Sequence, residues 1–247
     1  QIDEKKSINE TAENADTYST TSTENEKPTS DPNPDQPNLE STTEEAELTF
    51  DSLDIPPLLK QNLSELGFSK MMKIQQEAIP VILQNKDVLA AAKTGSGKTL
   101  AFLVPIISQM ITNFVNPSSG IVALIIAPTH ELALQTYEVS TKLVKGSEIT
   151  SGLAIGGNHK KSEAKAIASG INLLVATPGR LVDHILNTQH FTLSHVNYFV
   201  IDEADRILEI GFQTQLEEII QNLESPHQTL LFSATLSQDI TNLATLS

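Results

Sequence analysis

The segment at residues 92–99, which reads AKTGSGKT, constrains the fold of this chain more than any other stretch. The apolar run Val88–Ala91 precedes it, and a stretch with helical character at 100–110 follows it. A strand, a glycine-rich turn and a Lys-Thr pair at a helix start form a phosphate-binding loop, because the glycines let successive backbone N–H groups converge on one anion. The partial positive charge of the helix N-terminus adds to that attraction. The pattern therefore predicts a nucleoside triphosphate site.

The residues of this loop have separate expected roles. The ammonium group of Lys98 is placed to reach the β- and γ-phosphates, and the Thr99 hydroxyl is an expected ligand of Mg²⁺. The general pattern begins with glycine, whereas Ala92 stands at that place. A Gly-Ser turn before an ordinary helix is the competing interpretation, and the Gly-Lys-Thr spacing argues against it. The residues expected to contact the nucleotide here are Ala92, Lys93, Thr94, Gly95, Ser96, Gly97, Lys98 and Thr99.

Short apolar runs alternate with helical segments in the rest of the chain. Strands are expected at Val88–Ala91 and then at 121–127, 153–155, 173–176, 198–201 and 230–232. Helices are expected at 57–66, 74–83, 131–144, 160–168, 180–186 and 213–223, with Pro80 bending or breaking the second of these. Apolar strands that alternate with helices indicate a parallel sheet covered on both faces. We therefore expect a single α/β domain at 49–247, with ligands at the carboxyl ends of its strands.

Residues 1–48 differ in composition from this domain. They consist mainly of Glu, Thr, Ser, Asn and Pro, and hold thirteen acidic residues against three lysines. Because so few apolar side chains cannot offset the entropy of ordering a chain, we expect a disordered acidic tail. The tail contributes most of the net charge of −15, so this charge does not exclude a nucleic-acid partner for the folded part. The chain has no cysteine, which excludes disulfides, and no apolar run approaches the ~20 residues that span a bilayer.

Two acidic residues directly follow one of the expected strands. The run at 198–201 leads into Asp-Glu-Ala-Asp, which begins at Asp202. A pair of carboxylates at a strand end, in the same sheet as a phosphate loop, suits phosphoryl transfer. Asp202 would hold Mg²⁺ through water, and Glu203 would orient and deprotonate the attacking water. A helix cap with solvated acids is the competing interpretation. The predicted catalytic residues are Lys98, Asp202 and Glu203, and the predicted metal ligands are Thr99 and Asp202.

The last expected strand runs into Ser-Ala-Thr, which begins at Ser233. The hydroxyls of Ser233 and Thr235 are placed to bond to the carboxylates of Asp202 and Glu203, which would couple the phosphate state to the rest of the sheet. A plain capping pair explains the same residues, and the sequence leaves both interpretations open.

Taken together, these motifs resemble the first RecA-like domain of a DEAD-box RNA helicase, a P-loop domain with a parallel sheet. Besides the three motifs above, Gly67-Phe68 followed by Ile74-Gln75 resembles the adenine-reading Q motif, with Phe50 as its upstream aromatic. The segments that resemble the strand-end loops holding the RNA backbone are Pro-Thr-His-Glu-Leu-Ala at 128–133, Gly156-Gly157 and Thr-Pro-Gly-Arg at 177–180. The similarity spans residues 50–247.

This resemblance implies ATP and Mg²⁺ as cofactors and RNA as a partner. Gln75 would hydrogen-bond the adenine edge and Phe50 would stack on the ring; a carboxamide offers a donor and an acceptor side by side, which suits adenine and rejects guanine. RNA would be contacted through phosphates and riboses, so no sequence preference is expected. The implied RNA-binding residues are Pro128, Thr129, His130, Gly157, Thr177, Pro178, Gly179 and Arg180.

Several positions depart from the family pattern or admit another role. His130 stands where the family usually has arginine, so a fixed charge is lost or becomes dependent on pH. Lys73 stands where the Q motif usually has proline, which leaves the chain less stiff. Arg180 is equally compatible with a structural role at a helix end. Asp183 and His184 are expected at the surface and outside the catalytic machinery.

The second RecA-like domain of the family is expected to be absent from this chain. In related NTPases an arginine supplied to the transferred phosphate raises the rate ~10³–10⁵-fold. The chain is therefore expected to bind ATP weakly, to hydrolyse it very slowly and not to unwind RNA. Segments at 92–94, 181–184 and 206–212 look most like the nucleolar branch that serves ribosome assembly, which implies a nuclear or nucleolar location.

Two main interpretations of function remain. The first is the ATPase domain of an ATP-dependent RNA helicase. The second is a truncated or degenerate module that binds nucleotide, or a partner, without turnover. A DNA-directed helicase of the same superfamily is a weaker third option, because such proteins usually lack the region around Gln75 in this form.

Overall fold

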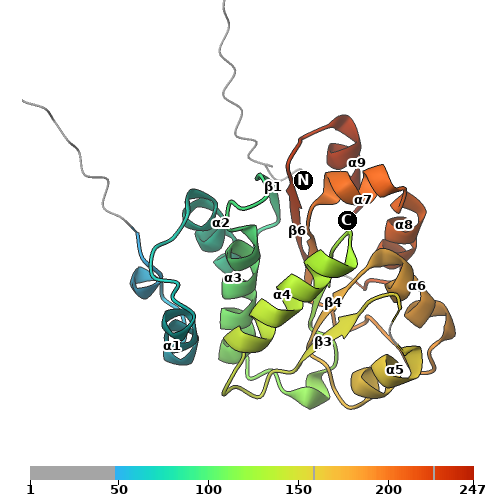
Figure 1. The fold of residues 1–247 in the computed structure, drawn as a ribbon, viewed down its shortest axis with the longest axis horizontal. Helices are drawn as coiled ribbons and strands as arrows, with labels where there is room; N and C mark the ends of the chain where they lie inside the picture. The colour runs from blue at the N-terminus through green and yellow to red at the C-terminus, as the bar shows by residue number, and fades with distance from the viewer. Residues whose placement is uncertain (1–47, 158, 225) are drawn as a thin grey trace, which may run out of the picture. The chain divides into compact units, whose positions relative to one another are not determined.

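The computed structural model describes residues 48–157, 159–224 and 226–247 (Figure 1). Within them, six strands form one sheet in the order β1-β6-β5-β2-β4-β3, and every neighbouring pair is parallel. The strands are β1 (Val88–Ala91), β2 (Ala123–Ile126), β3 (Ser151–Ala154), β4 (Leu173–Ala176), β5 (Tyr198–Ile201) and β6 (Gln228–Ser233). The acidic tail expected at 1–48 lies, except for its last residue, outside the described residues.

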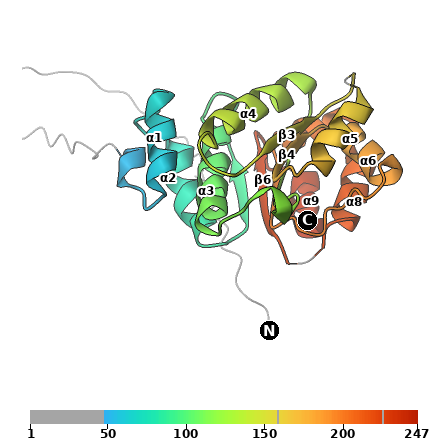
Figure 2. The ribbon, with the colours of Figure 1, turned by 90° about the horizontal axis from the view of Figure 1, so that it is seen from below.

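Helices cover both faces of this sheet, as Figures 1 and 2 show. The helices and 3-10 turns are η1 (Phe50–Ser52), α1 (Pro57–Glu65), α2 (Lys73–Leu83), α3 (Lys98–Thr112), η2 (Pro117–Ser119), α4 (His130–Leu143), α5 (Lys160–Ala168), α6 (Pro178–Asn187), α7 (Ala204–Ile210), α8 (Gln213–Gln221) and α9 (Gln238–Leu246). Helices α1 to α4 enclose one apolar core with the sheet, and α6 to α9 enclose the other. The predicted α/β fold with a parallel, doubly covered sheet is confirmed.

Alternation along the central strands assigns their side chains to the two cores. In β2, Ile125 belongs to the core under α3, whereas Leu124 and Ile126 belong to the opposite core. This is the period of two that an extended strand imposes on its side chains. The rings of Phe102 on α3 and Phe232 on β6 lie 5.5 Å apart in a tilted arrangement, which fastens α3 to the sheet.

Some element boundaries differ from the expectation, because polar residues extend two of the strands. β6 begins at Gln228 rather than at residue 230, since the Gln228 amide donates to the Ile82 carbonyl at 3.1 Å and is buried with it. β3 is shifted toward Ser151. Of the bend or break expected at Pro80, the break is wrong: α2 runs on to Leu83, with Pro80 on its exposed side. Among the described helices, none combines the length and the apolarity that a bilayer crossing requires.

Candidate active site

Three of the motifs meet where β1, β6 and β5 end. These strands are neighbours in the sheet, so the segments that follow Ala91, Ile201 and Ser233 emerge at the same edge. The Ala92 amide donates to the Ser233 carbonyl at 2.8 Å, which extends the β1–β6 ladder by one residue. The phosphate loop, Asp-Glu-Ala-Asp and Ser-Ala-Thr are therefore brought together, as the sequence predicts.

The phosphate loop turns through two glycines in the left-handed region. Gly95 has φ +81° and Gly97 has φ +86°, and α3 begins at the next residue, Lys98. The loop thus ends on a helix N-terminus, which suits an anion. Its exposed residues are Lys93, Thr94 and Gly95; Ser96, Gly97 and Thr99 are half-buried, and Ala92 and Lys98 are buried.

Gln75 contacts this loop from α2. Its amide nitrogen donates to the Gly97 carbonyl at 3.0 Å, and its side-chain oxygen accepts from the Met72 backbone N–H at 2.8 Å. Gln75 is buried rather than an exposed helix residue. Both ends of the carboxamide are committed within the protein, so an adenine edge at this place would exchange with these two bonds.

The side chain of Lys98 lies between the first two carboxylates of Asp-Glu-Ala-Asp, those of Asp202 and Glu203. Its Nζ is 3.6 Å from Asp202 Oδ1 and 3.5 Å from Glu203 Oε1. In the part of the chain that the structure describes, Lys98 Nζ and Asp202 Oδ1 have no hydrogen-bond partner although both are buried. A buried ammonium group without such a partner is costly unless a ligand completes its contacts.

Glu203 is held in a strained conformation beside this lysine. Its φ is +50°, in the left-handed region that non-glycine residues rarely adopt. The Thr94 hydroxyl donates to Glu203 Oε1 at 3.2 Å, which ties the phosphate loop to the carboxylate. The strained backbone and this bond together fix where the carboxylate points.

The electrostatics of the site are dominated by burial. Burial raises the pKa of Asp202 from 3.8 to about 6; the neighbouring Lys98 ammonium opposes this shift, whereas the Glu203 carboxylate adds to it. Glu203 and Lys98 therefore compete in setting the charge of Asp202, and a second cation at this site would favour its ionised form.

The residues present fit a phosphate group with a divalent cation. The glycine loop, the helix start at Lys98 and the unsatisfied ammonium group suit phosphate oxygens. Among residues 48–157, 159–224 and 226–247, no group of three or more His, Asp or Glu side chains could hold a metal ion. Mg²⁺ beside Thr99 and Asp202 would therefore take most of its oxygen ligands from the nucleotide and from water.

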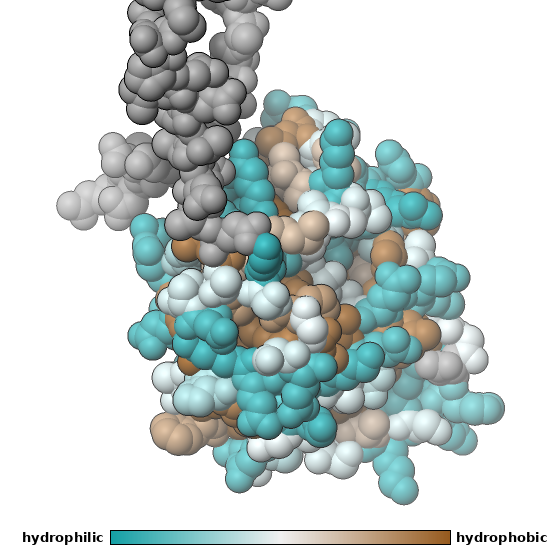
Figure 3. Space-filling view, turned by 60° about the vertical axis from the view of Figure 1, so that its left-hand side comes forward, coloured by the Kyte–Doolittle hydropathy of each residue, from teal (hydrophilic) through white to brown (hydrophobic). Residues whose placement is uncertain are grey.

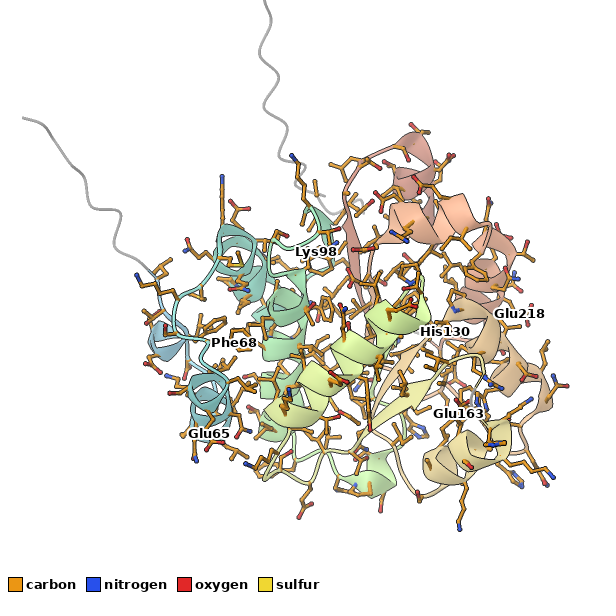
Figure 4. The ribbon with its side chains drawn as sticks, viewed as in Figure 1. Glu65, Phe68, Lys98, His130, Glu163 and Glu218 are labelled. Carbon is orange, nitrogen blue, oxygen red and sulfur yellow. The ribbon has the colours of Figure 1, made fainter. Side chains whose placement is uncertain are left out.

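The aromatic residue expected to stack on adenine is not available for that role. Phe50 is only 2 % exposed and packs in the core with Ile55 and Leu59, so the stacking expectation for Phe50 is wrong. Phe68, which is 37 % exposed, offers an accessible ring in the segment that leads into α2 (Figure 4). The flank of α1 and α2 presents apolar surface among hydrophilic side chains (Figure 3).

The Ser-Ala-Thr segment bonds to a different carboxylate from the one expected. The Thr235 hydroxyl donates to Asp205 Oδ2 at 3.4 Å, the Ala234 amide donates to the same oxygen at 3.1 Å, and the Ser233 hydroxyl accepts from the Thr235 amide at 3.3 Å. The predicted bonds to Asp202 and Glu203 are therefore corrected: α7 begins directly after Glu203 and turns Asp205 toward the end of β6.

A second group of predicted residues meets at the ends of β2, β3 and β4. They line a strand-end hollow of about 340 Å³, which is open to solvent. Its lining residues are Pro128, His130, Gly156, Thr177, Gly179, Arg180, Asp183 and Phe212. Asp183 and Phe212 were not predicted as site residues, since neither lies in a strand-end motif. Thr129 instead caps α4, Pro178 is buried, and Gly157 is exposed with φ +85°.

At the wall of this hollow, Arg180 is held by groups of the protein. Its Nε donates to the Ile155 carbonyl at 3.0 Å and lies 3.3 Å from Glu163 Oε2, and its Nη1 lies 3.7 Å from Asp183 Oδ2. His184 is fully buried, so its expected surface position is wrong. The reason is that its ring faces Glu163, with Nε2 3.0 Å from Glu163 Oε2.

Comparison with known proteins agrees with this geometry. Residues 72–243 match the DEAD/DEAH box helicase family, which is well over half of the chain. The chain belongs to this family. The expected resemblance to DEAD-box helicases is thereby confirmed, and the strand-end segments described above are those of a DEAD-box domain.

Individual relatives of this DEAD-box chain are ATP-dependent RNA helicases by name. The ATP-dependent RNA helicase HAS1 of Phaeosphaeria nodorum is 46 % identical over 198 residues, covering 80 % of this chain and 32 % of that protein. The probable ATP-dependent RNA helicase ddx18 of Dictyostelium discoideum is 46 % identical over 200 residues, covering 81 % of this chain and 33 % of that protein. The chain spans about a third of the length of these relatives.

A solved structure shares the fold. The crystal structure of a DEAD box protein from the hyperthermophile Methanococcus jannaschii matches with a TM-score of 0.73 and 36 % identity, over 80 % of this chain and 53 % of that one. The RecA-like fold expected for a DEAD-box domain is confirmed by this likeness.

Proposed function

We propose that residues 49–247 form the ATP-binding RecA-like domain of an ATP-dependent RNA helicase that hydrolyses ATP. The observation that carries this proposal is the buried ammonium group of Lys98, which lies at the base of a glycine loop, between two carboxylates and without a hydrogen-bond partner among the described residues. The family and the names of the relatives support an ATP-dependent helicase.

The roles of the site residues follow from their places. When bound, ATP with Mg²⁺ supplies the γ-phosphoryl group and the cation that neutralises its charge. Lys98, which lies beside the carboxylates of Asp202 and Glu203, contacts the phosphate oxygens. Thr99 and Asp202 are the protein groups placed to hold the cation. Glu203, fixed by Thr94 and by its own backbone, orients the attacking water and takes its proton.

Adenine is read at the start of α2 in this proposal. Gln75 is the buried carboxamide that can present a donor and an acceptor to the base, and Phe68 is the accessible aromatic ring of the same segment. Because Gln75 is bonded to Gly97, occupation of the base site would change the contacts of the phosphate loop.

RNA and a second RecA-like domain are the proposed macromolecular partners. The strand-end hollow gathers Pro128, His130, Thr177 and Gly179, which suits contacts to an RNA backbone without preference for sequence. The similarity to HAS1 and ddx18 supports the branch resemblance noted above. On that basis we propose a role in ribosome biogenesis, in rRNA processing, and a nucleolar location.

A nucleotide- or partner-binding module without turnover is the second candidate. The chain contains only two arginines, Arg180 and Arg206, and Arg180 is engaged inside the protein. His130 stands where the family usually has arginine, which carries a permanent charge. Such a chain by itself would bind nucleotide with little hydrolysis and no unwinding.

A thermal-shift experiment shows whether the chain binds nucleotide or carries the phosphate-loop motif without binding. The chain is melted in Mg²⁺ with ADP, ATP or GDP, beside Lys98→Ala and the control Lys142→Ala, which removes the same charge from the exposed face of α4. Ligand that binds only the folded state raises stability by RT ln(1 + [L]/Kd), so even millimolar affinity is measurable.

The proposal predicts stabilisation by adenine nucleotides, retained in Lys142→Ala and lost in Lys98→Ala. No shift with any nucleotide would overturn it. Equal shifts with GDP and ADP would overturn the role of Gln75. Phosphate release measured on the same samples, with and without single-stranded RNA, then decides between slow turnover and none.

A further inference from the structure

Glu163 is a buried carboxylate that the nucleotide site does not use. It projects inward from α5, and its side chain is only 7 % exposed (Figure 4). Its Oε1 accepts from the Ile155 backbone N–H at 3.3 Å, and its Oε2 lies 3.0 Å from His184 Nε2 and 3.3 Å from Arg180 Nε. One carboxylate therefore contacts the loop after β3 and the helix α6.

The groups around Glu163 extend this connection. His184 Nδ1 lies 2.9 Å from the Thr188 hydroxyl, and the ring stacks on Phe191 at 5.7 Å. Arg180 spans from Glu163 to the Ile155 carbonyl, so the backbone of Ile155 is bonded both as donor and as acceptor. A buried charge held by several partners is rigid, because loss of one partner leaves the others unsatisfied.

Further polar contacts, centred on Asp183, lie between this buried network and solvent. Lys160 Nζ donates to Asp183 Oδ1 at 2.6 Å and to the Asp183 carbonyl at 3.0 Å, and Asn187 donates to the same carboxylate oxygen at 2.9 Å. Hydrogen bonds from Lys160 and Asn187 hold the pKa of Asp183 below its usual range. Helices α5 and α6 are thus joined by the bonds of Lys160 to Asp183 as well as by the contacts of Glu163.

The two segments that Glu163 joins are those that line the strand-end hollow. Gly156 follows Ile155 directly, and Thr177 and Gly179 precede or adjoin Arg180. The two segments pair as strands up to Ala154 and Ala176, where the β3–β4 register ends, and one further backbone hydrogen bond joins them, from the Thr177 amide to the Ala154 carbonyl at 3.1 Å. Their relative position past the sheet therefore depends on side-chain contacts.

We propose that Glu163 is a positioning residue for RNA binding, and that Arg180 acts with it instead of contacting an RNA phosphate directly. The proposal rests on the RNA-binding part of the proposed function. The guanidinium of Arg180 is directed at Glu163, Asp183 and the Ile155 carbonyl, so its charge is compensated within the protein. Backbone groups of the two segments are left to contact the RNA.

The test compares Glu163→Gln and Arg180→Gln with the exposed control Glu148→Gln, which removes the same charge as Glu163→Gln. Binding of a fluorescent single-stranded RNA is measured over a series of salt concentrations, because each lost phosphate contact lowers the slope of log affinity against log salt by ~0.7. Each single variant is expected to bind about tenfold more weakly with the slope of the wild type, and the double variant no more weakly than either.

A direct phosphate contact by Arg180 gives the opposite pattern. Arg180→Gln would then lower the slope, and Glu163→Gln would release Arg180 and strengthen binding; either result overturns the proposal. If Glu163→Gln binds RNA with the same affinity as Glu148→Gln, the proposal is overturned as well. If Glu163→Gln fails to fold in a thermal melt, Arg180→Gln decides, since it leaves the Glu163–His184 contact in place.

Hydrogen exchange tests the positioning role of Glu163 without RNA. In Glu163→Gln, amides at 153–157 and at 177–184 are expected to exchange faster together, while those at 92–99 keep their rates. Faster exchange confined to α5 overturns the positioning role. If the wild type binds no RNA, the proposed function fails on that point, and the exchange result alone decides whether Glu163 joins the two segments.

Discussion

The side-chain amide of Gln75 donates a hydrogen bond to the backbone carbonyl of Gly97, 22 residues later in the chain, at 3.0 Å. This contact joins α2 to the last turn of the phosphate loop. It also explains why glycine stands at position 97, because a Cβ there would collide with the Gln75 amide nitrogen and lie 2.7 Å from the Met72 sulfur. Helix α2 and the phosphate loop are therefore packed as one unit.

Replacing Gly97 with alanine is expected to damage this unit more than the same change at Gly95. Both residues have φ above +80°, so each substitution costs ~1–2 kcal/mol of backbone strain. At Gly97 the overpacking against Gln75 adds ~1–3 kcal/mol, whereas a Cβ at Gly95 meets nothing within 4 Å. Chemical denaturation of Gly97→Ala and Gly95→Ala measures the difference. Equal losses of unfolding free energy in the two variants would show that the Gln75 side chain moves aside without destabilising the fold.

The stability of the nucleotide-free, metal-free chain is expected to depend on pH through Asp202. The folded-state pKa, about 6, lies above the ordinary value of 3.8, so the protonated form is favoured in the fold. The contribution of this group to stability is therefore fully present below pH 4 and is lost as the pH rises through 6, by roughly 3 kcal/mol.

Asp202→Asn imitates the protonated side chain and provides the comparison. The free energy of unfolding of Asp202→Asn minus that of the wild type is expected to grow between pH 4 and about 6 and then to level off, since other titrating groups are common to both chains. Urea denaturation at several pH values measures it. A difference that stays constant over this range would contradict the raised pKa of Asp202.

The aromatic residues before α2 are expected to have separable effects. Phe50→Ala removes a fully packed ring and should destabilise the fold by ~3–5 kcal/mol. Phe68→Ala should change stability little but weaken ADP binding by ~1–3 kcal/mol, the range for stacking of an aromatic ring on a base. Calorimetric titration with ADP measures the second effect. Unchanged affinity in Phe68→Ala would remove Phe68 from the base site.

The core beneath α3 is expected to respond strongly to loss of one ring. Phe102 is fully buried against Phe232, so Phe102→Ala should cost ~3–5 kcal/mol of stability. Phe114, two residues past the end of the same helix, is 86 % exposed, and Phe114→Ala should change stability by less than ~0.5 kcal/mol. Thermal and urea melts of both variants measure the contrast. A large loss in Phe114→Ala would reveal a contact of that ring that its exposure does not suggest.

Much of the fold could be predicted from local patterns in the sequence. The strands at 88–91, 173–176 and 198–201 and the helix at 160–168 have the expected bounds. These elements are apolar or amphipathic over their own length, so their type depends on neighbouring residues alone. The order of glycine, lysine and threonine after Ala91 likewise determined that a phosphate loop would join a strand to a helix.

Local patterns predicted less well wherever the burial of a side chain depends on tertiary contacts. Gln228 opens β6 because its amide reaches Ile82, a contact across 146 residues that no window of sequence contains. Phe50 and Phe68 have the same side chain, but Phe50 is buried by packing with Ile55 and Leu59, whereas Phe68 is accessible.

The sequence by itself determined which segments end at the ligand edge of the sheet, because strands and their loops are local. Only the tertiary structure decided which side chains meet there, since the strand order β1-β6-β5-β2-β4-β3 is not the order of the chain. That order brings Thr235 to Asp205 rather than to Asp202 or Glu203. Tertiary packing also turns Arg180 of α6 inward to Glu163 of α5, where a buried carboxylate holds the guanidinium more firmly than solvent would.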